Sequence, residues 1–272
     1  MFNMTTKDAF DPSAARARCR QHRRRILDIS QTVSALHIAP AFSCMEIVDT
    51  IYYGLMRRDL GPNADDTFII SKGHGSLAQY AVLESLGIVS KAELDLYGKP
   101  GGRFATHPDY GLPGIEASTG SLGHGLNLAV GMAAADKVRR ADRVVFVVMS
   151  DGEFQEGSTW EAMMLAPTLG ITRIVGVLDL NDFQSLGQTS KIHPNFYPVL
   201  DKVRAFGWET VQVDGHGCFT KSMLTVYGLA FGTRTAFPSL SVCSYGWLLS
   251  SSLAGDGSGC WESLTSKSRY DR

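Results

Sequence analysis

Two polar turns follow apolar segments that are typical of buried strands. Residues 144–149 are uninterrupted apolar residues that run into Asp151 and Gly152, and residues 174–178 run towards Asn181. If these strands are neighbours in a parallel sheet, a carboxylate and an amide oxygen meet at one edge. Such hard oxygen ligands suit Mg²⁺ or Ca²⁺, and because they are few, a ligand with further oxygens, such as a diphosphate, would complete the site. An Asp-Gly turn alone is common and equally fits an ordinary turn.

A glycine-rich loop and three histidines are the other candidates for chemistry. Residues 119–125 read Thr-Gly-Ser-Leu-Gly-His-Gly and precede an apolar helical stretch, so the backbone amides of this loop could approach a cofactor. The loop is neither a Walker loop nor a dinucleotide fingerprint. His37, His74 and His107 lie in loop-like segments, and their spacing excludes a local zinc motif. A functional role for them therefore requires the fold to assemble them in space.

The elements that must position these residues alternate between helix and strand. Helical character is found at residues 12–30, 44–57, 77–86, 126–138, 158–169 and 200–206. Strands are predicted at residues 144–149, 174–178 and 209–213, and residues 68–70 form a further short apolar run. This alternation predicts an α/β fold with a mainly parallel sheet and helices on both faces. Residues 98–125 are rich in Gly and Pro and are predicted to form long functional loops.

Composition limits the class of protein further. The chain has 272 residues, 44% of them hydrophobic, and a formal net charge of −1. This balance does not favour nucleic acid as a partner, and no stretch is apolar enough to predict a membrane span or a secretory signal. The basic run at residues 16–25 fits a solvated helix face. The five cysteines contain no CxxC pair, so we expect neither a disulfide framework nor a zinc site, and we expect a cytoplasmic protein.

Taken together, these motifs resemble the diphosphate-binding part of transketolase, a thiamine-diphosphate enzyme. The matching segments are residues 71–75, 114–123, 151–162 and 204–209, and they occur in the order of the family. The resemblance covers about residues 30–216. It implies the thiamine-diphosphate-binding fold for residues 1–216. Because a full transketolase is far longer, we expect the N-terminal subunit of a split enzyme, with a separate C-terminal subunit that supplies the pyrimidine-binding domain, as a heterotetramer.

The resemblance also implies a metal and cofactor site. Asp151, Asn181 and the backbone carbonyl of Phe183 would bind Mg²⁺, or Ca²⁺ or Mn²⁺ in its place. His74 and the amide of Gly152 would contact the diphosphate of the cofactor.

Further positions are implied around the cofactor and the substrate. Gly120 and Leu122 would line the cofactor, and Glu156 matches a buried, cofactor-side glutamate near the dimer contact. His37 and His107 would face the substrate, bind its hydroxyls and move protons, a task that suits imidazole because its pKa lies near neutrality.

The function implied is transfer of a two-carbon ketol unit from a ketose phosphate to an aldose acceptor. Two alternatives stay open. The alpha subunit of a 2-oxo-acid dehydrogenase shares the Asp-Gly and Asn pair, although the loops at residues 71–75 and 116–125 argue against it. A catalytically impaired remnant, or a subunit that only binds a partner, is the other alternative.

Residues 217–272 are the reason for that second alternative. They contain no histidine, and Ser occupies eleven of the 56 positions and Gly seven. Periodicity is poor, and residues 250–259 resemble low complexity. We therefore predict an atypical tail, in which the helix and the strand expected after residue 216 are not evident. A frameshift in the coding sequence explains this composition, and a divergent or disordered tail is the other explanation.

Overall fold

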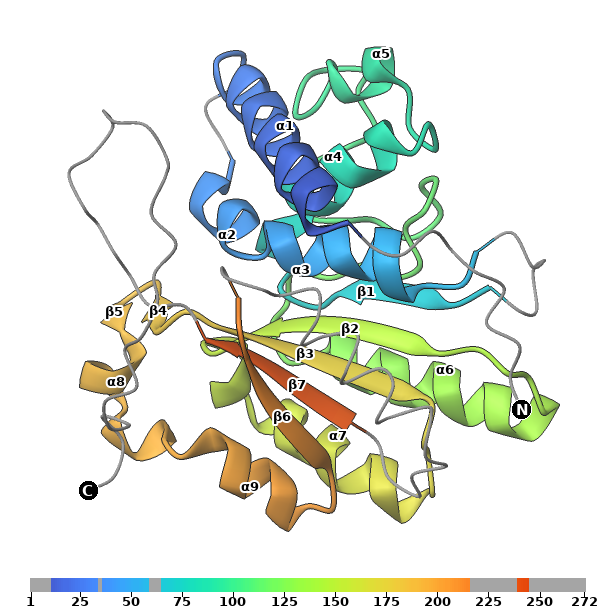
Figure 1. Ribbon diagram of the computed structural model, residues 1–272, viewed down its shortest axis with the longest axis vertical. Helices are drawn as coiled ribbons and strands as arrows, with labels where there is room; N and C mark the ends of the chain where they lie inside the picture. The colour runs from blue at the N-terminus through green and yellow to red at the C-terminus, as the bar shows by residue number, and fades with distance from the viewer. Residues whose placement is uncertain (1–10, 34–35, 59–64, 216–238, 245–272) are drawn as a thin grey trace.

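The fold is built around a parallel sheet. The computed structural model describes residues 11–33, 36–58, 65–215 and 239–244 (Figure 1). The strands of its central sheet follow the order β1-β2-β3-β7-β6. Their bounds are Thr67–Ile70 for β1, Val145–Ser150 for β2, Ile174–Leu180 for β3, Ser239–Ser244 for β7 and Glu209–Asp214 for β6. Every pairing in this sheet is parallel, which confirms the predicted class of sheet.

The helices follow the predicted segments closely. The α-helices are α1 (Pro12–Ser30), α2 (Ile38–Ser43), α3 (Met45–Thr50), α4 (Ser76–Ser85), α5 (Lys91–Leu94), α6 (Gly125–Arg139), α7 (Gly157–Thr168), α8 (Thr189–Ile192) and α9 (Val199–Ala205). Shorter turns are η1 (Ile51–Leu55), η2 (Gly73–Gly75), η3 (Glu153–Gln155) and η4 (Pro194–Phe196), and a small hairpin joins β4 (Phe183–Gln184) to β5 (Gly187–Gln188). The segment predicted as one helix at residues 44–57 is divided, because the α-helix α3 continues into the π-turn η1.

The two faces of the sheet bury alternate residues of β2. Phe146 and Val148 belong to a cluster with α1, α3 and α4, whereas Val145, Val147 and Met149 pack with α6 and α7. Alternation is expected because successive side chains of a strand point to opposite faces. Figure 1 shows α1–α4 on one side of the sheet and α6, α7 and α9 on the other. The sequence-based prediction of helices on both faces is therefore confirmed.

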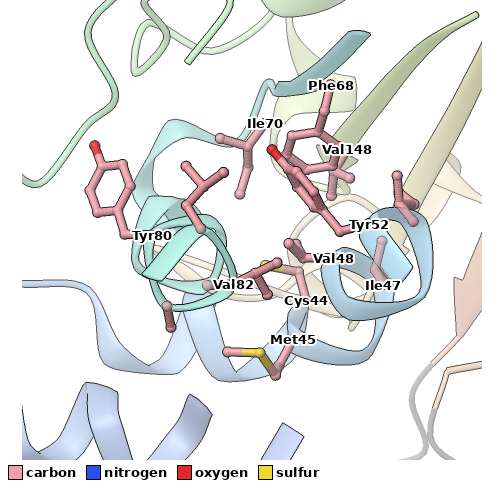
Figure 2. Packing of buried hydrophobic residues seen from close by; sticks show 14 of the residues in the cluster. Cys44, Met45, Ile47, Val48, Tyr52, Phe68, Ile70, Tyr80, Val82 and Val148 are labelled. Atoms are coloured by element: carbon pink, nitrogen blue, oxygen red, sulfur yellow. The ribbon is translucent and has the colours of Figure 1, made fainter. Parts of the chain in front are cut away.

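The first of these clusters is shown in Figure 2. Tyr52 of η1 contacts Phe68 of β1, with ring centroids 4.9 Å apart, and Ile70 and Val148 lie beside this pair. Cys44, between α2 and α3, is a fully buried free thiol within the same cluster. This packing joins the short helices α2 and α3 to the end of β1, where the predicted site loops begin.

Core packing on this face should account for much of the stability of the domain. We expect Phe146→Ala to lower the free energy of unfolding by about 3–5 kcal/mol, because the ring is fully buried and its loss leaves a cavity. The control Val138→Ala removes a side chain that is 85% exposed and should change the free energy by no more than about 0.5 kcal/mol. Denaturant unfolding of the full chain measures both values, and equal effects of the two substitutions would contradict this packing.

The basic run of α1 has two different faces. Arg16, Arg20 and Arg24 are exposed, as expected of a solvated helix face. By contrast, Arg18 forms a salt bridge with Asp49 of α3, with 2.8 Å between Arg18 Nη2 and Asp49 Oδ2. Arg23 and Arg25 pair in the same way with the carboxylates of Glu46, Glu84 and Asp95. The inward arginines therefore dock α1 on α3, α4 and α5.

One strand was not foreseen in the sequence. A strand after residue 216 is not evident from the composition of the tail, but β7 lies between β3 and β6 and pairs with both in parallel. The sheet therefore includes a strand from this part of the chain. The segment Ser-Leu-Ser-Val-Cys-Ser alternates apolar and small residues, which suits a strand, and the pairing edges of β3 and β6 supply backbone partners for it. The rest of residues 217–272 lies outside the described residues, so their proposed origin in a frameshift stays a hypothesis.

Within the part of the chain that the structure describes, none of the helices combines the length and the apolar character needed to cross a membrane.

Candidate functional site

The carboxyl ends of β2 and β3 are neighbours, as the two polar turns predicted. Ser150 of β2 is the register partner of Asp179 of β3, so Asp151 and Asn181 follow paired positions on adjacent strands. The connection between them is the helix α7, in agreement with the predicted crossover. The side chains of Asp151 and Asn181 are both buried. The sheet therefore brings a carboxylate and an amide to one edge.

Hydrogen bonds define the position of the Asp151 side chain. Asp151 Oδ1 accepts a bond of 2.9 Å from the amide of Gly152, and Oδ2 accepts one of 2.9 Å from Thr189 Oγ1 of α8. Burial, together with the charge of Asp179, raises the pKa of Asp151 to about 6. A bound cation would stabilise the ionised form of such a carboxylate, because the cation offsets the cost of burying the negative charge.

Asn181 is joined to the turn that follows it. The backbone amide of Phe183 donates a 2.8 Å hydrogen bond to Asn181 Oδ1, and this turn is stabilised by Asp182, which adopts a left-handed conformation with φ of 64°. Asp182 also accepts hydrogen bonds from Ser190 and from Tyr197. Phe183 itself begins the small β4–β5 hairpin, so the hairpin, α8 and the strand end form one unit.

The three histidines predicted from separate segments converge. The ring of His37 lies 5.9 Å from that of His74 and 5.7 Å from that of His107, centroid to centroid. His37 immediately precedes α2, His74 lies in η2 after β1, and His107 lies in the Gly- and Pro-rich loop region. The fold thus assembles a histidine cluster that sequence spacing alone could not establish.

Two of these histidines are held in the neutral form. Burial, followed by the charge of Lys72 and the neighbouring rings, lowers the pKa of His74 from 6.5 to about 3. Burial also lowers the pKa of His107, with a smaller contribution from His37. A neutral imidazole can accept a proton or a hydrogen bond, as acid–base catalysis requires.

The neutral state of His74 has a consequence for stability. Its pKa is about 3 in the folded chain and 6.5 for a solvated histidine, so the unfolded state binds the extra proton between these values. We expect the free energy of unfolding to fall as the pH decreases below 6.5. The slope against pH that this group contributes corresponds to the uptake of at most about one proton on unfolding. Denaturant unfolding of the cofactor-free chain at several pH values should show a shallower slope for His74→Gln. Identical slopes would contradict the assignment to His74.

The glycine-rich loop packs closely against two of the histidine segments. A Cβ atom at Gly120 would lie 2.9 Å from the ring of His107, and Gly120 has φ of +141°, which favours glycine. A Cβ atom at Gly73, beside His74, would lie 2.7 Å from the backbone nitrogen of Gly120. The loop at residues 119–123 and the turn at residues 71–75 therefore approach each other without any side chain between their backbones.

Substitution at Gly73 tests this close approach. Gly73→Ala should cost about 1–3 kcal/mol of stability, because the added Cβ meets the backbone of Thr119 and Gly120 rather than a flexible side chain. Gly131→Ala is the matched control, since nothing lies within 4 Å of a Cβ there and Gly131 is inside the helix α6. The control should stabilise the chain by up to about 1 kcal/mol. A Gly73→Ala chain as stable as the control would refute the close contact.

A buried glutamate that the sequence analysis did not single out connects the three loops. Glu153 Oε1 accepts hydrogen bonds from the amide of Gly123, at 3.0 Å, and from the hydroxyl of Ser71. Burial raises the pKa of Glu153, and these bonds oppose the rise. The residue joins the segments 71–75, 119–125 and 151–156. Its place directly after Asp151-Gly152 was the available signal, but sequence gives no indication of its partners.

Two of the predicted cofactor residues are less enclosed. Leu122 is partly buried, and its carbonyl oxygen lies 3.0 Å from Nδ1 of His124. Glu156 is exposed in this chain, and because the resemblance implies its burial near a dimer contact, that expectation stays a prediction.

The donors at the strand ends fit a divalent cation that carries a diphosphate. One carboxylate, one amide oxygen and one backbone carbonyl are hard oxygen donors, too few for a complete coordination shell without phosphate oxygens. Among the described residues, no group of three or more His, Cys, Asp or Glu side chains is arranged to bind a metal ion. A cavity of about 760 Å³ elsewhere, lined by Phe154, Trp160 and Phe206 among others, includes none of the predicted site residues.

A parallel sheet with oxygen donors after two adjacent strands, beside a glycine loop, is the architecture of a diphosphate-binding α/β domain. The comparison with known families is more specific. Residues 17–224 match the transketolase thiamine diphosphate binding domain, and the chain therefore belongs to the transketolase family.

Similar proteins include separate subunits as well as long transketolases. The chain is 36% identical over 200 residues to the A subunit of apulose-4-phosphate transketolase from Phocaeicola vulgatus, covering 72% of this chain and 70% of that protein. It is 36% identical over 184 residues to 6-deoxy-6-sulfo-D-fructose transketolase subunit SqwG of a Clostridium species, covering 66% of each. Human transketolase is 34% identical over 223 residues, 79% of this chain but only 35% of that protein.

Solved structures agree on the fold. Transketolase from Leishmania mexicana superposes with a TM-score of 0.77 at 25% identity, over 85% of this chain and 36% of that one. Transketolase from Campylobacter jejuni gives a TM-score of 0.78 at 23% identity, over 87% of this chain and 38% of that one. The chain thus spans little more than a third of these longer enzymes, and the thiamine-diphosphate-binding fold is confirmed.

Proposed function

We propose that the chain is a subunit of a transketolase that transfers a two-carbon ketol unit from a ketose phosphate to an aldose acceptor. The observation that supports this most directly is the position of Asp151 and Asn181 after adjacent strands, together with the converging His37, His74 and His107. Relatives that are named as individual transketolase subunits support a split enzyme. A C-terminal subunit would then supply the pyrimidine-binding domain, as a heterotetramer.

The metal and the diphosphate would be bound at the end of the sheet. Asp151, Asn181 and the carbonyl of Phe183 would bind Mg²⁺, Ca²⁺ or Mn²⁺. His74 would donate a hydrogen bond to the diphosphate, and the amide of Gly152, which donates to Asp151 Oδ1 in this chain, would be shared between that oxygen and the diphosphate. Because the two donors flank the strand ends from different loops, they would orient the cofactor as well as bind it.

The other residues would act on the cofactor ring and the sugar. Gly120 permits a close approach of the loop backbone, and Leu122 would contribute an apolar wall. Thiamine diphosphate, when bound, supplies the carbon that attacks a ketose and the electron sink for cleavage of its carbon–carbon bond. His37 and His107 would bind the donor hydroxyls, and the low pKa of His107 leaves its ring free to accept a proton from one of them.

Glu156 would be covered by the partner subunit. The stem of this exposed residue lies next to the glycine loop, since a Cβ at Gly123 would be 2.7 Å from Glu156 Cβ. We therefore place the partner contact at this end of α7, beside the cofactor loop. An incomplete site of this kind explains why a second chain would be needed for activity.

Reconstitution tests this function. The purified chain is mixed with a C-terminal transketolase subunit from the same organism, thiamine diphosphate and Mg²⁺, and ketol transfer is measured with pentose phosphates and with branched and sulfonated sugars. We expect ketol transfer by the complete mixture only. Full activity of the chain without a partner would contradict the split enzyme.

The same assay separates the alternatives. Activity with 2-oxo acids instead of sugars would favour the alpha subunit of a 2-oxo-acid dehydrogenase. No cofactor binding and no activity with any partner would favour an impaired remnant, for which the composition of residues 217–272 is the motivating observation.

A further inference from the structure

A buried ion pair lies directly behind the proposed metal site. Lys72 Nζ is 2.5 Å from Asp179 Oδ2, and the two side chains are 1% and 0% exposed. Lys72 follows β1 and Asp179 belongs to β3, so the pair links the two strands that flank β2. Burial opposes the charge of Lys72, but the carboxylate of Asp179 outweighs it and raises the pKa of Lys72. In this pair Lys72 Nζ donates a hydrogen bond to Asp179 Oδ2.

The second oxygen of Asp179 reaches a different element. Ser43, the last residue of α2, donates its hydroxyl proton to Asp179 Oδ1 over 3.0 Å. Because a serine hydroxyl has a single proton, Ser43 Oγ has only acceptor capacity left. That capacity is used by Asn181, whose Nδ2 donates to Ser43 Oγ over 3.0 Å. The backbone amide of Phe183 can only donate, and it donates to Asn181 Oδ1. Asn181 Nδ2 must therefore be the donor to Ser43, and the Ser43 proton must point to Asp179.

The consequence concerns the orientation of the Asn181 amide. A reversed amide would place Oδ1 against Ser43 Oγ, which has no proton to donate, and Nδ2 against the amide of Phe183, which is also a donor. Both contacts would be lost, so only one orientation satisfies the surroundings. In that orientation Oδ1 faces the turn at Phe183, whose carbonyl is another of the proposed ligands.

We propose that Ser43 and Asp179, supported by Lys72, are positioning residues that present the Asn181 oxygen to the divalent cation. This inference rests on the proposed function, because it assumes that Asn181 is a metal ligand. Removal of such a partner behind a metal ligand typically costs 10–100-fold in metal affinity. A merely structural role, docking α2 on β3, predicts instead a loss of stability with unchanged metal affinity.

The test compares three variants of the full chain. Ser43→Ala removes the hydroxyl, Ser43→Thr retains it, and Ser85→Ala is the control, since Ser85 bonds to Tyr53 on the surface of α4. Mn²⁺ affinity is measured by water-proton relaxation in the presence of thiamine diphosphate, with a transketolase C-terminal subunit present. We expect Ser43→Ala to weaken Mn²⁺ binding about 10–100-fold, and Ser43→Thr and Ser85→Ala to stay within about threefold of the unsubstituted chain. An unchanged affinity in Ser43→Ala would overturn the proposal.

A second measurement needs neither metal nor cofactor. The side-chain amide protons of Asn181 are observed by ¹⁵N-resolved hydrogen exchange in the cofactor-free chain, assigned with Asn181→Asp. Exchange should accelerate at least about tenfold in Ser43→Ala and not in Ser85→Ala, because only the first removes the hydroxyl that accepts a hydrogen bond from Nδ2. Equal exchange rates would overturn the proposal. If the unsubstituted chain fails to bind Mn²⁺ but shows this protection, the proposed function fails while the orienting contact stands.

Discussion

Asp151→Ala should reduce the affinity of the chain for thiamine diphosphate in the presence of Mg²⁺ by at least about 100-fold, since loss of a residue that only supports a metal ligand already costs about 10–100-fold. Asp151 is the one carboxylate among the three proposed metal ligands, so its removal takes away the only negatively charged ligand that the chain offers the cation. Calorimetry of the chain with its partner subunit measures the affinity.

The stability of the cofactor-free variant separates this effect from unfolding. Burial raises the pKa of Asp151 to about 6, so the folded chain disfavours its charge, whereas the hydrogen bonds from Gly152 and Thr189 stabilise it. Because these two effects oppose each other, we expect Asp151→Ala to change the thermal stability of the cofactor-free chain little and to abolish the increase in stability that bound ligands give. Asp201→Ala is the control, because Asp201 is a carboxylate that is 66% exposed and pairs with Arg204 on the surface. Tight binding by Asp151→Ala would remove this residue from the site.

His107→Asn should lower kcat/KM for ketol transfer by about 10²–10⁴-fold while thiamine diphosphate affinity changes little, because a positioned acid–base group contributes about this much. The ring of His107 contacts Gly120 and lies beside His37, but the proposed contacts to the diphosphate belong to His74 and Gly152. The substitution therefore separates catalysis from cofactor binding. His193→Asn, at an exposed histidine, is the control.

The pH profile gives a further check on this histidine. If His107 moves protons in the rate-limiting step, the acidic limb of the kcat/KM profile should change in His107→Asn and stay the same in His193→Asn. A large loss of cofactor affinity in His107→Asn, with kcat unaffected, would assign the residue to binding instead.

The class of fold followed from the sequence because two strands are continuously apolar. The run at residues 144–149 can be buried on both faces only in a covered parallel sheet, and the structure divides its side chains between two helical layers. The positions of Asp151 and Asn181 could be predicted for the same reason, because polar residues that follow buried parallel strands must lie at the carboxyl end of the sheet. Local patterns were sufficient for both.

What sequence did not predict depends on contacts between distant segments. Ser43 and Asp179 are 136 positions apart, and nothing in the residues around either one indicates their hydrogen bond. Glu153 is likewise buried by loops that begin far away in the chain. The strand β7 was missed because its serine-rich sequence has little hydrophobic signal, whereas its neighbours β3 and β6 supply the pairing that stabilises it.

The exposure of Glu156 has a different cause. The resemblance implies burial near a dimer contact, which a single chain does not include, so the burial of Glu156 stays a prediction. Its position beside the glycine loop remains informative, because it predicts that partner binding and cofactor binding are coupled at this end of the sheet.

A calorimetric titration of thiamine diphosphate tests the central claim most directly. The chain is mixed with its C-terminal subunit and titrated once with Mg²⁺ and once with a chelator. We expect saturable binding with one cofactor for each copy of this chain, lost with the chelator and in Asp151→Ala. Absence of Mg²⁺-dependent binding in the complete mixture, or binding that Asp151→Ala leaves unchanged, would contradict it.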